Sequence, residues 1–470
     1  MKLRNTLQKL SAKYLPLLLT AYVILQPVID VLTSLGTRAN MTITVGLVVR
    51  TLFMAYAFVY TVFISKFKQK KFVLLYLSLI TAYMLAFAIY MSSLGPISYV
   101  LANIKETVKT FFFPYVAVYF YAVYKEHNFV ISKKTVAITT SLYAGSIFLA
   151  YLTGSSFTSY QSGYGYCGWF YAANEISDIL SLVSPIAICF ALEYIKNNTN
   201  MNKKQVCVTI SLLGLIFVCI FACTYIGTKV IFPIILVYLI LCAVRFIIGY
   251  IKAKNNKNII SLIIAILFCV ITVCMYTSSP LNDYLSDVYL PIGDETSEEA
   301  KLLRENSEHI YNNTILGRMI RDNKALEKLN WLLSQRLIII ATSVEEYVTG
   351  DIGTIMLGIG YKNNSSYEYD IEKMIEMDAP AVLCRHGIVG FALIYLPYFA
   401  LICYFVISFF KKPKHILDSL SRCTYLYISV IGFIISLLIG HTIMSPNVSL
   451  FIVFTAMTVL SEIEKQNNQI

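Results

Sequence analysis

The stretch that decides the fold class, residues 14–35, reads YLPLLLTAYVILQPVIDVLTSL. It is close to the roughly 20 apolar residues that a helix needs to cross the hydrocarbon core of a bilayer. Pro27 and Asp30 lie inside it, and it lacks a small-residue cleavage site, so we predict a retained first span and not a signal peptide. Similar runs recur almost to the C-terminus, without the alternating pattern of a membrane β-barrel.

The composition supports the same fold class. Of the 470 residues, 57% are hydrophobic and 14% are charged, which fits no soluble class. We predict an all-α polytopic membrane protein with about twelve transmembrane helices. The predicted spans are residues 14–35, 42–64, 72–91, 106–124, 135–152, 171–194, 206–223, 230–248, 259–276, 387–410, 423–440 and 448–460.

The distribution of basic residues predicts the orientation. Lys2, Arg4, Lys9 and Lys13 precede the first span, and each predicted inner loop carries several lysines. The short outer loops are nearly free of basic residues apart from Arg38. By the positive-inside rule, we predict a multi-pass protein of the cytoplasmic membrane with both termini in the cytoplasm.

A long polar insertion, residues 278–386, is predicted to face outward as a large extracytoplasmic loop between spans nine and ten. It holds eighteen of the 27 Asp and Glu and ten of the 38 Lys and Arg, so its charge is −8 and that of the remainder is +19. The formal net charge of +11 therefore describes a cytoplasmic rim against anionic lipid, not a nucleic-acid surface. Residues 1–277 then carry spans one to nine, and residues 387–470 carry the last three spans and a short cytoplasmic tail.

Two helices are expected within this insertion. Thr296 is placed to cap one that runs from Glu298 toward Glu308. The second is predicted over residues 323–347, where apolar residues recur at steps of three and four, and Gly350 and Gly353 would end it.

Ionisable residues in or beside the apolar spans are functional candidates, because burying a charge in a membrane is costly unless the charge is paired or faces a cavity. Cations at the outer membrane level, flanked by carboxylates, suit a lipid-linked pyrophosphate. The alternative is ion pairing that serves only folding, such as Arg50 with Asp30. We expect His386 and His441 to be interfacial histidines. The candidates are Asp30, Arg50, Lys105, Glu106, Lys109, Glu175, Asp178 and Lys229.

The sequence gives no support for several other chemistries. It lacks the HExxH, paired CxxC, Walker-type phosphate-loop and GxSxG patterns, so we predict no metal and no cofactor. Most of the eleven cysteines lie in apolar runs, where they behave as small hydrophobes. Cys167 and Cys384 fall near the predicted outer face, where two free thiols are favoured over a disulfide.

Short motifs at the outer ends of the predicted spans resemble a known pattern. They are GWFYAANE at 168–175, TYIGTK at 224–229, SQR at 334–336, LGIGY at 357–361, EMD at 376–378 and RHGIVG at 385–390. With about twelve spans and a large late outer loop, they resemble the O-antigen polymerase and ligase superfamily. Members of that superfamily join polyprenyl-pyrophosphate-linked glycans outside the cytoplasmic membrane.

The resemblance implies roles for individual residues. Glu376 or Asp378 would be the catalytic base, and Arg336 would be the catalytic cation, with Lys229, Arg385 and Arg50 binding the pyrophosphate. Glu376 stands where ligases of the superfamily carry histidine, and Lys229 stands in place of an arginine. These departures favour a polymerase of the Gram-positive capsule or exopolysaccharide kind over a lipid A ligase. The glycan-binding candidates are Trp169, Asn174 and Glu175.

The predicted function is therefore that of a repeat-unit polymerase whose donor is a glycan on undecaprenyl pyrophosphate. The expected partners are that lipid-linked oligosaccharide, membrane lipid, and a chain-length regulator and flippase of the same pathway, with no nucleic acid. Three alternatives remain open at this point: a glycan ligase of the same superfamily, a lipid-linked oligosaccharide flippase or transporter, and a non-catalytic assembly or receptor protein. The single large insertion and the absence of two similar halves argue against a transporter.

Overall fold

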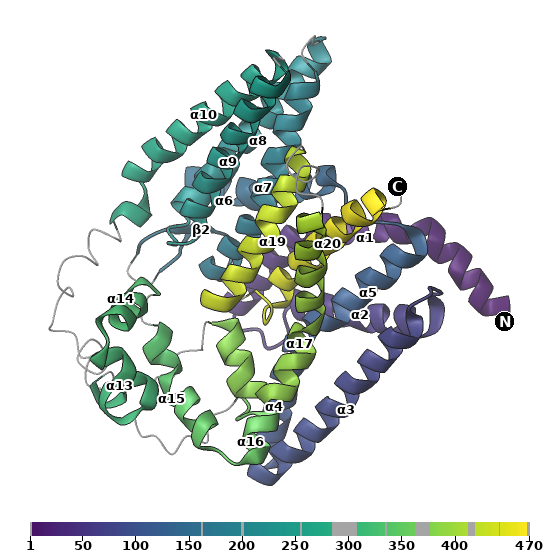
Figure 1. Ribbon diagram of the computed structural model, residues 1–470, viewed down its shortest axis with the longest axis vertical. Helices are drawn as coiled ribbons and strands as arrows, with labels where there is room; N and C mark the ends of the chain where they lie inside the picture. Colours follow the sequence, from purple (N-terminus) through teal and green to yellow (C-terminus); the bar gives the residue numbers. More distant parts are fainter. Residues whose placement is uncertain are drawn as a thin grey trace.

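Helices dominate the fold, as the apolar runs predict (Figure 1). The computed structural model describes residues 2–160, 163–198, 202–253, 256–283, 308–333, 336–361, 377–411, 419–440 and 442–467. Within these ranges, eleven helices are long and apolar enough to cross a membrane. They are α1 (Lys2–Arg38), α2 (Val45–Val59) with the π-helical turn η1 (Tyr60–Ile64), α3 (Lys70–Leu94), α6 (Lys133–Leu152), α7 (Ala173–Asn197), α8 (Lys203–Tyr225), α9 (Ile231–Ala253), α10 (Asn256–Thr277), α17 (Asp378–Lys411), α19 (Leu420–Leu438) and α20 (Pro446–Asn467).

The predicted fourth span is the one that differs. The structure divides it into α4 (Ile97–Thr110) and α5 (Phe112–His127), with the break at Phe111. Pro114 accounts for the break, because a continuous helix would need its missing N–H to pair with the carbonyl of Thr110. At 16 residues, α5 is about 24 Å long, which is short for a membrane span.

Contacts between helix ends define two levels in the molecule. At one level, Lys125 at the end of α5 binds Glu464 near the end of α20, with Nζ 2.7 Å from Oε2. At the other level, Glu175 at the start of α7 accepts a hydrogen bond of 2.7 Å from Asn447 at the start of α20. We call the second level the site end. Helix α5 begins at the site end and finishes at the other level.

The centre of the bundle is α7, which is buried along almost its whole length. Helices α6, α8, α9, α19 and α20 all pack against it. Figure 1 shows α8, α9 and α10 together on one side of this centre, and α1, α2 and α3 on the other. Since α7 has few polar positions beyond its first turns, its burial follows from its apolar sequence.

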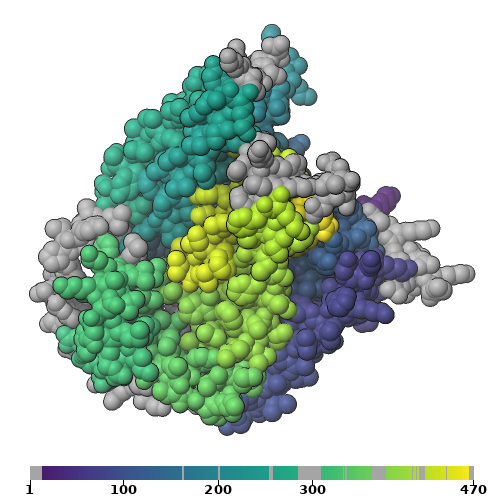
Figure 2. Space-filling model, in the orientation of Figure 1, coloured from purple at the N-terminus to yellow at the C-terminus, as the bar shows by residue number. Residues whose placement is uncertain are grey.

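The described part of the polar insertion is helical and forms a small lobe on one side of the molecule (Figure 2). Its described helices are α13 (Ile315–Asp322), α14 (Lys324–Leu332), α15 (Arg336–Thr349) and α16 (Ile352–Leu357). Ile310, Ile320, Ile338 and Ala341 form its core. Ile340 packs on Ala381 and so docks the lobe on α17.

The single helix predicted over residues 323–347 is wrong, because the chain turns at Leu333 and divides it into α14 and α15. Asn330 provides a physical reason: its side-chain oxygen accepts a hydrogen bond of 3.2 Å from the backbone N–H of Ile338. This bond satisfies an N–H in the first turn of α15, and both helices can then face one core. The helix predicted from Glu298 toward Glu308 lies outside the described residues except at its end.

Candidate functional site

Lys229 lies in the short turn between α8 and α9, at the site end. The turn is anchored to α7 by a 2.6 Å hydrogen bond between the hydroxyls of Thr228 and Ser177. Gly227 has a φ of +79°, and a Cβ there would lie 3.0 Å from Cα of Gly165, so the turn packs closely on the loop before α7. Sequence positions far from each other thus hold one lysine in a fixed place.

The structure brings Lys229 next to the helical lobe. Its Nζ lies over the ring of Trp331, 5.7 Å from the ring centroid, and Arg336 opens the neighbouring helix α15. Burial, and then the positive charge of Arg336, lower the pKa of the Lys229 ammonium below its ordinary value. Two cations from distant parts of the chain are therefore near neighbours, an arrangement that favours a multivalent anion between them.

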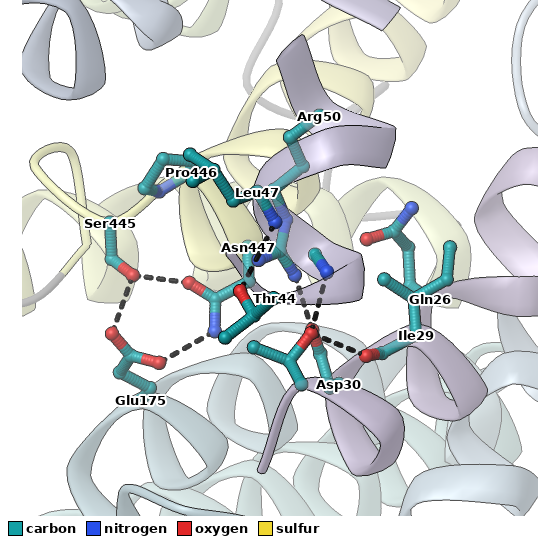
Figure 3. A network of polar contacts seen from close by, with 12 residues as sticks. Gln26, Ile29, Asp30, Thr44, Leu47, Arg50, Glu175, Ser445, Pro446 and Asn447 are labelled. Atoms are coloured by element: carbon teal, nitrogen blue, oxygen red, sulfur yellow. Dashed lines mark hydrogen bonds and ion pairs between the residues drawn. The ribbon is translucent and has the colours of Figure 1, made fainter. Parts of the chain in front are cut away.

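A buried polar network lies at the same level, between the later part of α1 and the first turns of α2, α7 and α20 (Figure 3). Arg50 forms an ion pair with Asp30, whose second oxygen accepts a hydrogen bond from Tyr143. Glu175 accepts hydrogen bonds of 2.8 Å from Ser445 and 2.7 Å from Asn447. Of the two interpretations that the sequence left for Arg50, the structure shows the ion pair with Asp30. Glu175, predicted to bind glycan, joins α7 to the start of α20.

Two of the glycine motifs meet in space where α17 is broken. Gly387 interrupts α17 with a φ of +63°, and Gly358 ends α16 with a φ of +91°. The backbone N–H groups of Ile359 and Gly360 donate to the carbonyls of Cys384 and Arg385, over 2.9 and 3.1 Å. The segment after α16 therefore satisfies carbonyls that the break in α17 leaves without a helical partner.

We expect the Gly358→Ala variant to be destabilised by about 2–3 kcal/mol, because it combines a positive φ with a backbone clash. A Cβ at Gly358 would lie 2.3 Å from the carbonyl of Arg385, which cannot move aside as a flexible side chain would. The measurement is thermal unfolding of the detergent-purified protein. Gly145→Ala is the control, because a Cβ there meets nothing within 4 Å. Equal unfolding temperatures for the two variants would contradict the close contact between Gly358 and the backbone of Arg385.

Next to the break in α17, His386 is fully buried, so the expectation of an interfacial histidine is wrong. Its Nε2 is 2.7 Å from the hydroxyl of Tyr361, and its Nδ1 is 3.1 Å from the hydroxyl of Tyr83. The guanidinium of Arg385 lies over the ring of Tyr361, 5.0 Å from the centroid. Tyr361 also contacts the hydroxyl of Thr110 at the end of α4. These residues form a second polar cluster at the site end.

Of the two predicted catalytic carboxylates, Asp378 and Glu376, the structure describes only Asp378. Asp378 is buried, and one of its oxygens accepts hydrogen bonds of 2.8 and 2.6 Å from the backbone of Thr442 and Ile443 and one of 2.7 Å from the Thr442 hydroxyl. These contacts fix the loop that precedes α20 to the start of α17. Glu376 and His441 lie outside the described residues, so the role of Glu376 stays a prediction.

An aromatic rim precedes α7. It follows a two-stranded hairpin of β1 (Phe157–Thr158) and β2 (Tyr166–Gly168). Trp169 is partly exposed and donates from Nε1 to the hydroxyl of Ser155 over 3.0 Å, and Asn174 is partly exposed in the first turn of α7. The guanidinium of Arg38 lies 3.6 Å from the ring centroid of Phe157. Cys167 and Cys384 are both free thiols, as the sequence favoured.

Sequence reasoning missed several members of this region. Trp331, Ser445 and Asn447 were not singled out, although each contacts a predicted site residue, and Tyr361 was quoted only as the last residue of the LGIGY motif. Trp331 carried a usable signal, since it is one of only two tryptophans and lies five residues before Arg336. Ser445 and Asn447 carried none, because their role depends on a contact with α7.

One comparison with known proteins gives a family match. The sequence model of a family described as O-antigen ligase like membrane protein matches residues 12–466, almost the whole chain. The match confirms the resemblance that the motifs predict. A search of curated proteins finds no match.

Proposed function

Because the chain belongs to the O-antigen ligase-like membrane protein family, we propose that it is a polysaccharide repeat-unit polymerase. The family supports a membrane glycan ligase- or polymerase-type role and a lipid-linked oligosaccharide substrate. In the proposed reaction, a growing glycan leaves undecaprenyl pyrophosphate and joins a lipid-linked repeat unit at the outer face of the cytoplasmic membrane. Both termini then lie in the cytoplasm, and a flippase of the same pathway supplies the repeat units.

The observation that carries the proposal is the closeness of Lys229 and Arg336. Two like charges held close together repel each other, and a multivalent anion bound between them relieves that repulsion. A departing pyrophosphate gains negative charge as the glycosidic bond breaks, and positive groups already in place stabilise it most at that moment. Trp331 supports the position of Lys229 from the lobe side.

The chemical step needs a base as well as these cations. An oxygen of the acceptor hydroxyl attacks the anomeric carbon of the donor sugar, and its proton passes to the carboxylate of Glu376. The bond from the anomeric carbon to the pyrophosphate oxygen breaks, and the electron pair leaves with undecaprenyl pyrophosphate beside Lys229 and Arg336. Asp378, whose one oxygen is held by three donors, suits a supporting role to Glu376. The partly exposed Trp169 and Asn174 are placed to contact sugar rings.

The test is incubation of the purified protein with lipid-linked repeat units alone. A polymerase converts them to a ladder of chain lengths, whereas a ligase makes no ladder without its other acceptor. Glu376→Gln in the same assay tests the base, and full chain length from this variant would remove Glu376 from the mechanism. Absence of a ladder from the active wild type, with transfer to another acceptor, would favour the ligase.

The lowered pKa of Lys229 gives an expected pH dependence. The charged ammonium is the form that binds pyrophosphate, so kcat/KM should fall as the pH rises through the Lys229 pKa, which lies below that of an ordinary lysine. Lys229→Arg should move this alkaline limb upward, since arginine stays protonated. The measurement is the pH profile of kcat/KM for the donor. An alkaline limb at the same pH in both proteins would assign it to another group.

A further inference from the structure

An apolar cavity of about 330 Å³ lies between α5, α17 and α20. If each chain carbon takes the roughly 30 Å³ of a liquid water molecule, the cavity holds about ten carbons. Its lining includes Phe113 and Ala117 of α5, Tyr398 and Leu401 of α17, and Ala456 and Met457 of α20. An apolar cavity of this size in a close-packed protein is a candidate for a hydrocarbon ligand.

The cavity opens on the side of α17. Ala456 and Ala117 are buried and form its floor, whereas Ala400, which also lines it, is exposed. Both α17 and α20 are candidate membrane spans, so the phase outside this opening is the hydrocarbon of the bilayer. The occupant that can enter from there is a lipid chain.

The guanidinium of Arg385 lies at the site end, on the side of the cavity nearest the start of α17. Among the described residues, the Arg385 guanidinium has no hydrogen-bonding partner, and its contact is with the ring of Tyr361. The ring of Phe111 packs edge-on against His386 with centroids 5.7 Å apart, and Phe113, two residues on, packs against Tyr398 in the cavity wall. The two aromatic contacts thus lead from the Arg385 cluster to the cavity. From the break at Gly387 to Tyr398, α17 runs for roughly 17 Å at 1.5 Å per residue.

We propose that Arg385 and the cavity together bind the acceptor substrate, with its pyrophosphate at Arg385 and a segment of its polyprenyl chain between α5, α17 and α20. This inference rests on the proposed function. A polymerase must hold two polyprenyl pyrophosphates at once, and the structure offers two separate cationic places, at Lys229 and Arg336 for the donor and at Arg385 for the acceptor. The positive head position and the apolar cavity match the head and the chain of such a lipid.

The test uses undecaprenyl pyrophosphate with a diazirine on a middle isoprene unit, roughly 20 Å from the pyrophosphate, and the full-length protein in nanodiscs. After irradiation, we expect labelled peptides from residues 113–121, 397–404 and 452–460. Unlabelled undecaprenyl pyrophosphate should compete, and undecaprenol should compete more weakly. Arg385→Ala should abolish that difference, because it removes the cation that distinguishes the two competitors. Equal competition by phosphatidylglycerol would overturn the proposal, because it would mark a general lipid site.

Cavity-filling variants provide the matched comparison. Ala456→Trp and Ala400→Phe should each reduce labelling by at least about tenfold, as expected when a fitted apolar pocket is blocked. Leu396→Trp is the control, since Leu396 is an exposed residue of the same helix outside the cavity. The same loss of labelling in both variants would show that the loss comes from filling the cavity and not from misfolding of one variant. Unchanged labelling in both would overturn the proposal.

A kinetic arm separates this inference from the proposed function. With repeat units on a long or a short prenyl chain as acceptors, Ala400→Phe should raise the KM for the long-chain acceptor by about tenfold and leave the short-chain KM unchanged. An increase in the donor KM instead would overturn the acceptor assignment. A protein that is labelled in the cavity but makes no ladder would contradict the polymerase function, and one that makes a ladder without cavity labelling would contradict only this inference.

Discussion

Arg336→Ala is expected to lower kcat/KM for the lipid-linked donor by about a hundredfold to a thousandfold, the range for removing one preorganised stabilising group. Arg336 is the cation that the lobe contributes next to Lys229, and both charges would face the departing pyrophosphate. The effect should appear in kcat as well as KM, because the pyrophosphate is most negative in the transition state. The measurement is single-turnover glycan transfer with purified repeat units.

The control for this variant is Arg318→Ala, which removes an exposed arginine from α13 of the same lobe. It should leave the rate unchanged. Arg336→Lys should recover part of the activity, since it restores a charge without the planar geometry of guanidinium. The double variant with Lys229→Ala should lose less than the product of the single losses if both cations serve one pyrophosphate. If Arg336→Ala reacts at the wild-type rate, Arg336 does not stabilise the departing pyrophosphate, and the lobe does not contribute a cation to the site.

The second large effect is expected for stability. Asp30→Ala should lower the free energy of unfolding by about 3–5 kcal/mol, because it leaves the Arg50 charge buried without its partner. The side chains of Arg50 and Asp30 are only 14% and 6% exposed, so solvent cannot replace the lost contact. Arg50→Ala should cost a similar amount, and the double variant less than the sum. Unfolding by SDS titration is the measurement.

Glu106→Ala is the matched comparison for this pair. Its ion pair with Lys109 has side chains 31% and 39% exposed, and such pairs contribute about 0–1 kcal/mol. A clear gap between Asp30→Ala and Glu106→Ala would support the buried pair as a structural element of the site end. If the two variants unfold alike, the Asp30 carboxylate does not stabilise Arg50, and Arg50 would again be a candidate for pyrophosphate binding.

The fold class was predictable because a membrane span is a local property. Each apolar run must satisfy its own backbone in hydrocarbon, so a helix of sufficient length follows from composition alone. The failure at the predicted fourth span was also local in origin. Pro114 and the charges of Lys105, Glu106 and Lys109 were present in the sequence, and they mark the break between a polar α4 and a short apolar α5.

The candidate site was predictable only in part. The motifs identified Lys229, Arg336 and the glycines at 358 and 387 as members of one family pattern. Which of them meet was not visible, because the contacts join residues about a hundred positions apart or cross between helices. Arg50 illustrates the limit, since its neighbour Asp30 decides between a substrate ligand and a structural ion pair.

The sequence by itself determined the helical membrane architecture, the polar insertion and the family to which the chain belongs, because hydrophobic length and short motifs act within a few turns of the chain. Only the tertiary structure decided the partners of each charge. It placed Lys229 beside Arg336, closed Arg50 on Asp30 and buried His386 between two tyrosines. These outcomes depend on which side chains share a low-dielectric space, and packing of distant helices sets that.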